Sequence, residues 1–128
     1  MRIEHVAIWT RDIEKLRNFY VKYFQVTVGE KYVNVTKNFQ SYFLTFENGC
    51  RLELMQMPGI SDNSSRGEQY MGLTHIAIAV GSKENVDDLT RQLQTDGYDV
   101  VGYPRTTGDG YYESVILDPE GNRIEITV

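Results

Sequence analysis

The 128-residue sequence lacks the features that mark membrane, secreted and nucleic-acid-binding proteins. Its single cysteine, Cys50, has no partner for an intramolecular disulfide, so we expect a reducing, cytoplasmic location. No apolar run approaches the roughly 20 residues that span a bilayer, and the first residues lack the long apolar stretch of a secretory signal. The formal net charge of -5, without a basic stripe, disfavours nucleic acid as a partner. These absences predict a small globular domain without membrane or nucleic-acid partners.

An internal repeat organises the chain. The sequence HVAI at 5–8 recurs as HIAI at 75–78, an offset of 70 residues. The sequence GCRLEL at 49–54 matches GNRIEI at 121–126, an offset of 72 residues. Because both matches have nearly the same offset, the chain is expected to contain two copies of one structural module.

Helix signals occupy equivalent positions in the two halves. Asp12 and Ser82 are residue types that cap helix N-termini, and each precedes an amphipathic stretch. Gly97 follows the second stretch, at a position where a left-handed backbone favours glycine. The residues whose spacing keeps one helical face apolar are Leu16, Phe19 and Tyr23 in the first half and Val86, Leu89 and Leu93 in the second.

The segments after each helix predict strands, because they are rich in β-branched and aromatic residues. In the first half these strands cover 26–35 and 39–46, and the turn at 47–49 contains the Asn-Gly pair typical of hairpins. In the second half, glycine-containing turns at 108–110 and 118–121 separate similar strands.

The whole pattern predicts an α+β fold built from two βαβββ modules. We expect the modules to pair into a cupped mixed β-sheet with the helices on the outside. Residues 1–128 then form a single domain, with module 1 at 1–58, a connection rich in Gly, Ser, Asp and Asn at 59–72, and module 2 at 73–128.

Strand alternation places both histidines and two glutamates opposite the helices. Successive side chains of a strand point to opposite faces of the sheet. His5 and Glu53 alternate with apolar residues that we expect to pack on the first helix, and His75 and Glu125 do the same in the second module. These are the only two histidines in the chain, and they occupy equivalent positions of the repeat.

Taken singly, each of these four residues is more often structural or solvated than a ligand. Pseudo-twofold pairing of the modules, however, would bring two imidazoles and two carboxylates towards one point. Such a set suits a divalent first-row metal, namely Ni, Co, Zn, Mn or Fe, with open positions for water or substrate. A metal-free site that has kept these residue types is the alternative.

Several motifs resemble those of the vicinal-oxygen-chelate superfamily, which includes glyoxalases, bleomycin-resistance proteins and ring-cleaving dioxygenases. They are His5 on a short strand, the Phe-Tyr pair at 19–20 on a helix, Leu-Glu-Leu at 52–54, His75, and DPEGN-x-I-E at 118–125. The resemblance covers essentially the whole chain, and the stretch at 118–125 is its most specific part. It implies a glyoxalase-like fold.

The resemblance implies a ligand set and a reaction. The family's metal ligands match His5, Glu53, His75 and Glu125, and a Glu at position 53 favours the glyoxalase I (lactoylglutathione lyase) pattern. In that family the metal holds two oxygens of a small substrate, and a Glu among the ligands moves a proton between adjacent carbons. Either Glu53 or Glu125 is then the catalytic base, and we favour Glu125.

Candidate substrate contacts come from two regions. Trp9 stands where bacterial glyoxalase I usually has an Arg that meets the glutathione carboxylate, which makes a thiol cofactor such as glutathione doubtful. Trp9 and Met55 are expected to line the cup, or to be buried at a subunit interface. Arg105 and Tyr112 lie in a polar, aromatic hairpin, which is either a substrate-binding segment or a solvated turn with one core tyrosine.

Two further functions are compatible with the resemblance. One is a metal-free protein that sequesters a ligand, as bleomycin-resistance proteins do, and the other is an Fe- or Mn-dependent ring-cleaving dioxygenase. A complete set of four ligands argues against both. The resemblance also implies a homodimer, with the site either within one chain or shared between two.

Overall fold

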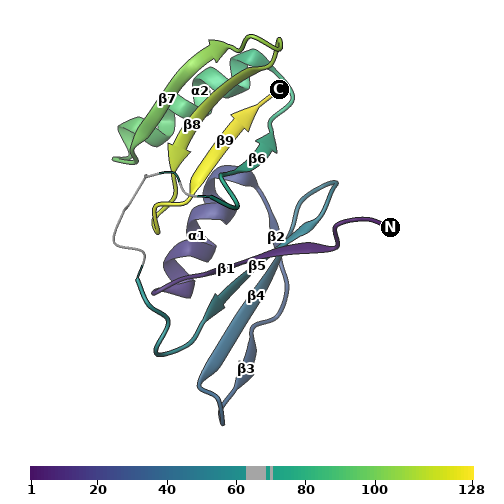
Figure 1. The fold of residues 1–128 in the computed structure, drawn as a ribbon, viewed down its shortest axis with the longest axis vertical. Coiled ribbons are helices and arrows are strands. Elements are labelled where there is room, and N and C mark those ends of the chain that lie inside the picture. The colour runs from purple at the N-terminus through teal and green to yellow at the C-terminus, as the bar shows by residue number, and fades with distance from the viewer. Residues whose placement is uncertain (63–68, 70) are drawn as a thin grey trace. The chain divides into compact units, whose positions relative to one another are not determined.

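Alternating apolar residues give each half of the chain a sheet with one helix on its buried face. The computed structural model describes residues 1–62, 69 and 71–128. The chain divides into unit 1, Met1–Asn63, and unit 2, Ser64–Val128 (Figure 1). The boundary lies within the predicted connection at 59–72, of which residues 63–68 and 70 lie outside the described residues.

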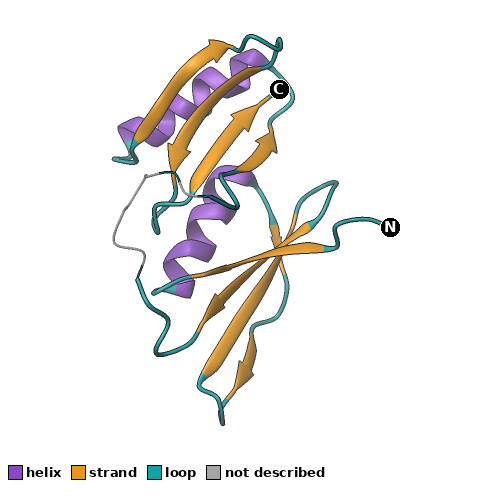
Figure 2. Cartoon of the chain, viewed as in Figure 1, coloured by secondary structure: helices purple, strands orange, loops and turns teal. Residues whose placement is uncertain are grey.

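Unit 1 contains one helix and a five-stranded mixed sheet (Figure 2). The strand order is β1-β5-β4-β2, and β3 also pairs with β4. β1 runs parallel to β5, whereas the other pairs are antiparallel. The elements are β1 (His5–Trp9), α1 (Ile13–Phe24), β2 (Thr27–Val28), β3 (Tyr32–Asn34), β4 (Phe39–Thr45) and β5 (Arg51–Gln56).

The helix α1 begins and ends where the sequence signals lie. The Asp12 side chain accepts a hydrogen bond from the backbone N–H of Lys15 at 3.0 Å, which confirms the predicted N-cap. The helix ends at Gln25, whose backbone is left-handed with φ of 53°. α1 packs against β4 and β5, and the buried side chains between them are Leu16, Phe19 and Tyr20 of the helix with Leu44, Leu52 and Leu54 of the strands.

Unit 2 repeats this architecture with a four-stranded sheet (Figure 1). The strand order is β6-β9-β8-β7, in which β6 is parallel to β9 and the other pairs are antiparallel. The elements are β6 (Ile76–Ala79), α2 (Lys83–Thr95), β7 (Val100–Thr106), β8 (Tyr112–Leu117) and β9 (Arg123–Thr127).

The helix α2 also has the predicted caps. The Ser82 side chain accepts a hydrogen bond from the backbone N–H of Asn85 at 3.1 Å. Gly97 follows the last turn with φ of 89°, which is the left-handed backbone expected there. α2 packs against β7, β8 and β9, and the buried hydroxyls of Thr90 and Ser114 share a hydrogen bond of 2.6 Å across this contact.

The two units confirm the α+β fold and differ from the sequence prediction in one strand. The single strand predicted at 26–35 is two strands, β2 and β3, because the register against β4 shifts by one residue between them. Thr27 pairs with Thr45, whereas Tyr32 pairs with Ser41, so one extra residue lies between these pairs. The Asn-Gly turn before β5 has the predicted positive φ, 92° at Gly49. No helix in the described part of the chain is long and apolar enough to cross a membrane.

Candidate metal centre

The first His–Glu pair lies on neighbouring parallel strands of unit 1. β1 and β5 pair with Ala7 opposite Glu53, which places His5 diagonally from Glu53 on the same face. Nε2 of His5 is 3.7 Å from Oε2 of Glu53. The side chain of His5 is 39% exposed and that of Glu53 is 15% exposed, so a largely buried carboxylate lies beside an accessible imidazole.

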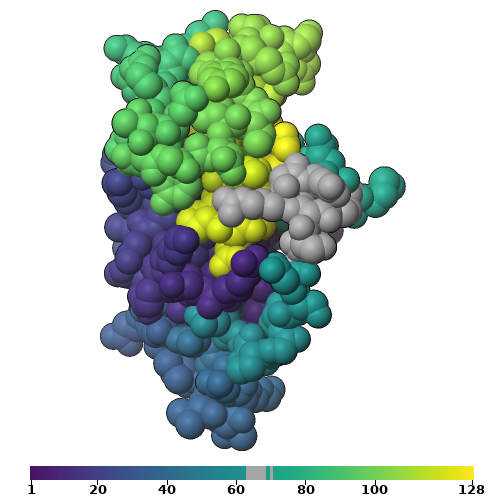
Figure 3. Space-filling model, turned by 90° about the vertical axis from the view of Figure 1, so that its left-hand side faces the viewer, coloured from purple at the N-terminus to yellow at the C-terminus, as the bar shows by residue number. Residues whose placement is uncertain are grey.

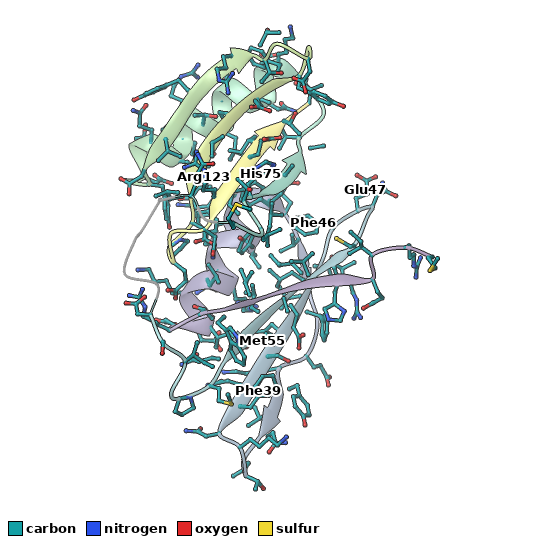
Figure 4. All side chains as sticks on the ribbon, in the orientation of Figure 1. Phe39, Phe46, Glu47, Met55, His75 and Arg123 are labelled. Atoms are coloured by element: carbon teal, nitrogen blue, oxygen red, sulfur yellow. The ribbon has the colours of Figure 1, made fainter. Side chains whose placement is uncertain are left out.

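The second pair repeats this geometry in unit 2. β6 and β9 pair with Ala77 opposite Glu125, and Nε2 of His75 is 3.4 Å from Oε2 of Glu125. His75 immediately precedes β6, and Arg123 is the first residue of β9 (Figure 4). The exposed fractions are 40% for His75 and 17% for Glu125, close to those of the first pair. Atoms of the first residues (purple) and of the last residues (yellow) both lie at the surface in Figure 3.

Each unit therefore supplies two of the four predicted ligands. Across residues 1–62, 69 and 71–128, no three His, Cys, Asp or Glu side chains gather into a group that could hold a metal. The assembly of both pairs into one site stays a prediction. The donor types fit a divalent ion, because imidazole nitrogens and carboxylate oxygens are ligands of first-row metals and two carboxylates would balance the charge of a dication.

Charged and aromatic side chains surround the first pair. Nδ1 of His5 is 2.5 Å from Oε2 of Glu4, and Arg51 forms an ion pair with the same carboxylate. The Arg51 guanidinium lies over the ring of Phe43, 4.0 Å from its centroid. The hydrogen bonds from His5 and then from Arg51 lower the pKa of Glu4 below its ordinary value.

The second pair has a carboxylate neighbour that the sequence analysis missed. Glu113 of β8 lies on the same face as Glu125, because Val115, two residues along the strand, is directly opposite Glu125. Burial raises the pKa of Glu125, the charge of Glu113 raises it further, and the nearby His75 lowers it in part. The Glu113 side chain is 13% exposed, and its Oε1 is 3.5 Å from Nη2 of Arg105.

Strand alternation in β8 is the signal that could have identified Glu113, and it places Tyr112 on the opposite face of the sheet. The hydroxyl of Tyr112 donates a 2.7 Å hydrogen bond to Asp87 of α2, so this ring lies on the helix side of the sheet and not with Glu125. This hydrogen bond raises the pKa of Tyr112. Arg105 pairs with Glu113 across β7 and β8 and lies on the same face as Glu125, and its role as a substrate contact stays a prediction.

Trp9 and Met55 lie together on the sheet face of the first pair. They are directly opposite each other in the β1–β5 pairing, with Met55 two residues from Glu53 and Trp9 four residues from His5. Trp9 is 39% exposed, and its ring is nearly perpendicular to that of Phe39, with centroids 6.2 Å apart. Phe39 and Met55 occupy the same part of the unit 1 sheet (Figure 4). This end of the face is therefore aromatic and apolar.

The sequence matches one protein family over nearly its whole length. A family model described as the Glyoxalase/Bleomycin resistance protein/Dioxygenase superfamily matches residues 2–126. The chain belongs to this superfamily. The match confirms the resemblance carried by the two histidines, the Leu-Glu-Leu segment and the motif at 118–125.

Individual relatives agree in fold. A glyoxalase family protein from Enterococcus faecalis is 25% identical with a TM-score of 0.77, and the alignment covers 98% of this chain and 96% of that one. Glyoxalase I from Zea mays is 20% identical with a TM-score of 0.78, over 98% of this chain and 44% of the maize chain. The uncharacterized protein YqjT from Bacillus subtilis is 36% identical over 59 residues, 44% of this chain and 46% of that protein.

Two of these alignments cover only part of the proteins concerned. The chain spans less than half of the maize enzyme, and the alignment with the Bacillus protein covers less than half of either sequence. At 20% identity, the likeness to the maize enzyme shows the fold alone.

Proposed function

We propose that this chain is a metal-dependent lyase or isomerase of the glyoxalase I kind, acting on a small oxygenated substrate. The observation that carries the proposal is the repetition of one His–Glu pair in both units, with Nε2–Oε2 distances of 3.7 and 3.4 Å. A pair that served only a structural role in one unit would not need to recur at equivalent strands of the other.

His5, Glu53, His75 and Glu125 would hold a divalent ion, Ni, Co, Zn, Mn or Fe, as two half-sites of one centre. When bound, the ion would polarise a substrate carbonyl and stabilise the negative charge that develops when a neighbouring C–H proton leaves. We propose that the half-sites meet in a homodimer or within one chain, since two modules of this fold supply one half-site each.

Glu125 is proposed as the base. Its pKa is raised by burial and by the charge of Glu113, and a carboxylate with a raised pKa accepts a proton more readily. One Oε atom of Glu125 would take the proton from one substrate carbon and return it to the adjacent carbon, so the reaction is redox-neutral. The Arg105 guanidinium beside Glu113 limits the repulsion between the two carboxylates.

The substrate is proposed to place an apolar part against Trp9 and Met55. These side chains share a face with the first His–Glu pair, and an indole ring cannot form an ion pair with a carboxylate as the Arg of a glutathione site does. We therefore expect a substrate other than a glutathione adduct. Arg105 is the proposed contact for a substrate oxygen in the second half-site, because it lies on the face of Glu125.

Metal content per chain tests the proposal. Purified protein, reconstituted with each divalent ion, is compared with the variants Glu53→Gln and His75→Ala and with the control Glu47→Gln, which changes an exposed loop carboxylate. We expect near-stoichiometric metal in the wild type and in the control, and a large loss in both site variants.

Reaction assays separate the activities of the superfamily. Methylglyoxal with several thiols is the substrate screen for the lyase, and oxygen consumption with a catechol detects the dioxygenase. Failure of the reconstituted wild type to bind any divalent ion would contradict the lyase proposal and favour a metal-free protein that sequesters an apolar ligand on the Trp9 face.

A further inference from the structure

We propose that Glu4 is a positioning residue that fixes the tautomer and orientation of His5. In this arrangement Nδ1 carries the ring proton and donates a hydrogen bond to Glu4. Nε2 keeps its lone pair and faces Glu53. The value of this arrangement for metal binding rests on the proposed function, but the tautomer itself does not.

The two ring nitrogens of His5 have different neighbours. Nδ1 is 2.5 Å from Oε2 of Glu4, and Nε2 is 3.7 Å from Oε2 of Glu53. A carboxylate only accepts hydrogen bonds, so the shorter contact requires the proton on Nδ1. A neutral imidazole carries one ring proton, and Nε2 is then the nitrogen available to a ligand on the side of Glu53.

Glu4 is itself held in place by β5. The backbone N–H of Arg51 donates to the carbonyl oxygen of Glu4 at 3.0 Å, and Nε of Arg51 donates to Oε1 of the Glu4 side chain at 2.8 Å. The carboxylate therefore uses one oxygen for Arg51 and the other for His5. Its position is set by the parallel pairing of β1 with β5, although Glu4 precedes the strand.

The ring of contacts closes through an aromatic side chain. The Arg51 guanidinium lies 4.0 Å from the centroid of Phe43, and the rings of Phe43 and His5 are nearly perpendicular, with centroids 5.4 Å apart. Phe43 is directly opposite Glu53 in the β4–β5 pairing. The His5 ring thus has a packed neighbour on one side and a hydrogen-bonded carboxylate at Nδ1, which together restrict its rotation.

The second half-site lacks this arrangement. The repeat offset of 70 residues places Thr74 at the position of Glu4. The strand registers place Val115, opposite Glu125, at the position of Phe43, opposite Glu53. A threonine hydroxyl donates as well as accepts, so it does not impose one tautomer on a neighbouring imidazole. The repeat therefore places no carboxylate at position 74 that would fix the tautomer of His75 as Glu4 does for His5.

A hydrogen bond donated by the second ring nitrogen of a liganding histidine to a carboxylate has a measurable effect on metal affinity. Removing such a partner typically lowers metal affinity by about 10–100-fold, because the ring loses its orientation and its favoured tautomer. We expect that loss for Glu4→Ala. The control Thr74→Ala makes the equivalent change in unit 2 and should leave affinity within about twofold.

The decisive experiment is a ¹⁵N–¹H correlation of the histidine rings in metal-free protein, at a pH about two units above the ordinary imidazole pKa. The chain has two histidines, so the variant His75→Ala assigns both sets of signals. We expect the Nδ1–H pattern for His5 in the wild type and a shift towards the Nε2–H tautomer in Glu4→Ala. Glu4→Gln leaves one acceptor oxygen for Arg51 and presents an amide NH2 that can donate to Nδ1, so it should also weaken the preference for the Nδ1–H tautomer.

The outcomes separate this inference from the proposed function. An unchanged His5 tautomer in Glu4→Ala overturns the positioning role, even when the wild type binds metal. A fixed Nδ1–H tautomer that is lost in Glu4→Ala supports it, even when the wild type binds no metal and the lyase proposal fails. Zinc titration by calorimetry then measures how much the preset ring contributes to affinity.

Discussion

Asp118 should contribute more to the stability of unit 2 than any other single polar side chain of the 118–125 motif. Its side chain is fully buried, at 0% exposure, in the turn that joins β8 to β9. Oδ1 accepts hydrogen bonds from the backbone N–H groups of Glu120 and Asn122, each at 2.9 Å, and Oδ2 accepts one from the Asn122 side chain at 2.9 Å. Asp118 of the most specific sequence motif thus stabilises a turn, and the proposed metal ligand Glu125 follows at the end of that motif.

The substitution Asp118→Ala removes three hydrogen bonds to a charged acceptor. At the lower value of about 1.5 kcal/mol each, their sum is about 4.5 kcal/mol. The donors are only partly buried and regain some hydration, so we expect the free energy of unfolding to fall by about 2–4 kcal/mol. Asn122→Ala removes one of the three bonds and should cost about 1 kcal/mol.

Urea unfolding followed by far-ultraviolet circular dichroism measures these differences. The fluorescence of Trp9, the one tryptophan, provides a second probe that lies in unit 1. Asp118→Asn keeps the acceptor for both backbone N–H groups and should lie between the alanine variant and the wild type. A loss in Asp118→Ala no larger than that in Asn122→Ala would refute the reasoning, because the three bonds would then not act together.

Two further changes test local features of unit 1. Gln25→Gly should raise the free energy of unfolding by up to about 1 kcal/mol, because the exposed Gln25 has a left-handed backbone with φ of 53°; a lower urea midpoint would contradict this. The hydrogen bond from Lys31, at 2.9 Å, and then that from Tyr42 lower the pKa of Glu14 below 4.5. The ionised Glu14 therefore contributes to the free energy of unfolding above pH 4.5, and this contribution is lost as pH falls through the folded-state pKa. Glu14→Gln should therefore flatten the acid side of the stability curve by less than about 1 kcal/mol, and an unchanged slope below pH 4.5 would count against the ion pair.

Much of the local structure follows from short stretches of sequence. The caps Asp12 and Ser82 and the glycine after α2 act within a few residues of their own position, so their chemistry alone determines where the helices begin and end. The same is true of strand alternation, which placed His5 and Glu53 on one face. The repeat then extended each of these inferences to the other half of the chain.

Long-range pairing accounts for what the sequence analysis missed. The break between β2 and β3 depends on their register against β4, which no local pattern in 26–35 reveals. The sequence left open whether Tyr112 contacts a substrate or packs in the core, and its hydroxyl donates to Asp87, 25 residues away in the chain. Strand alternation separates the two faces of β8, but tertiary packing determines which face lies against α2.

By itself the sequence determined the family, the α+β modules and the residue types of both His–Glu pairs, because these depend on periodicity and on a repeated motif. Only the tertiary structure decided how each pair is tuned. Glu113 raises the pKa of Glu125 from a neighbouring strand, and Arg51 holds Glu4 against His5 from a strand about 47 residues away. Electrostatic and hydrogen-bond effects act through space over a few ångströms, so they depend on which strands become neighbours when the chain folds.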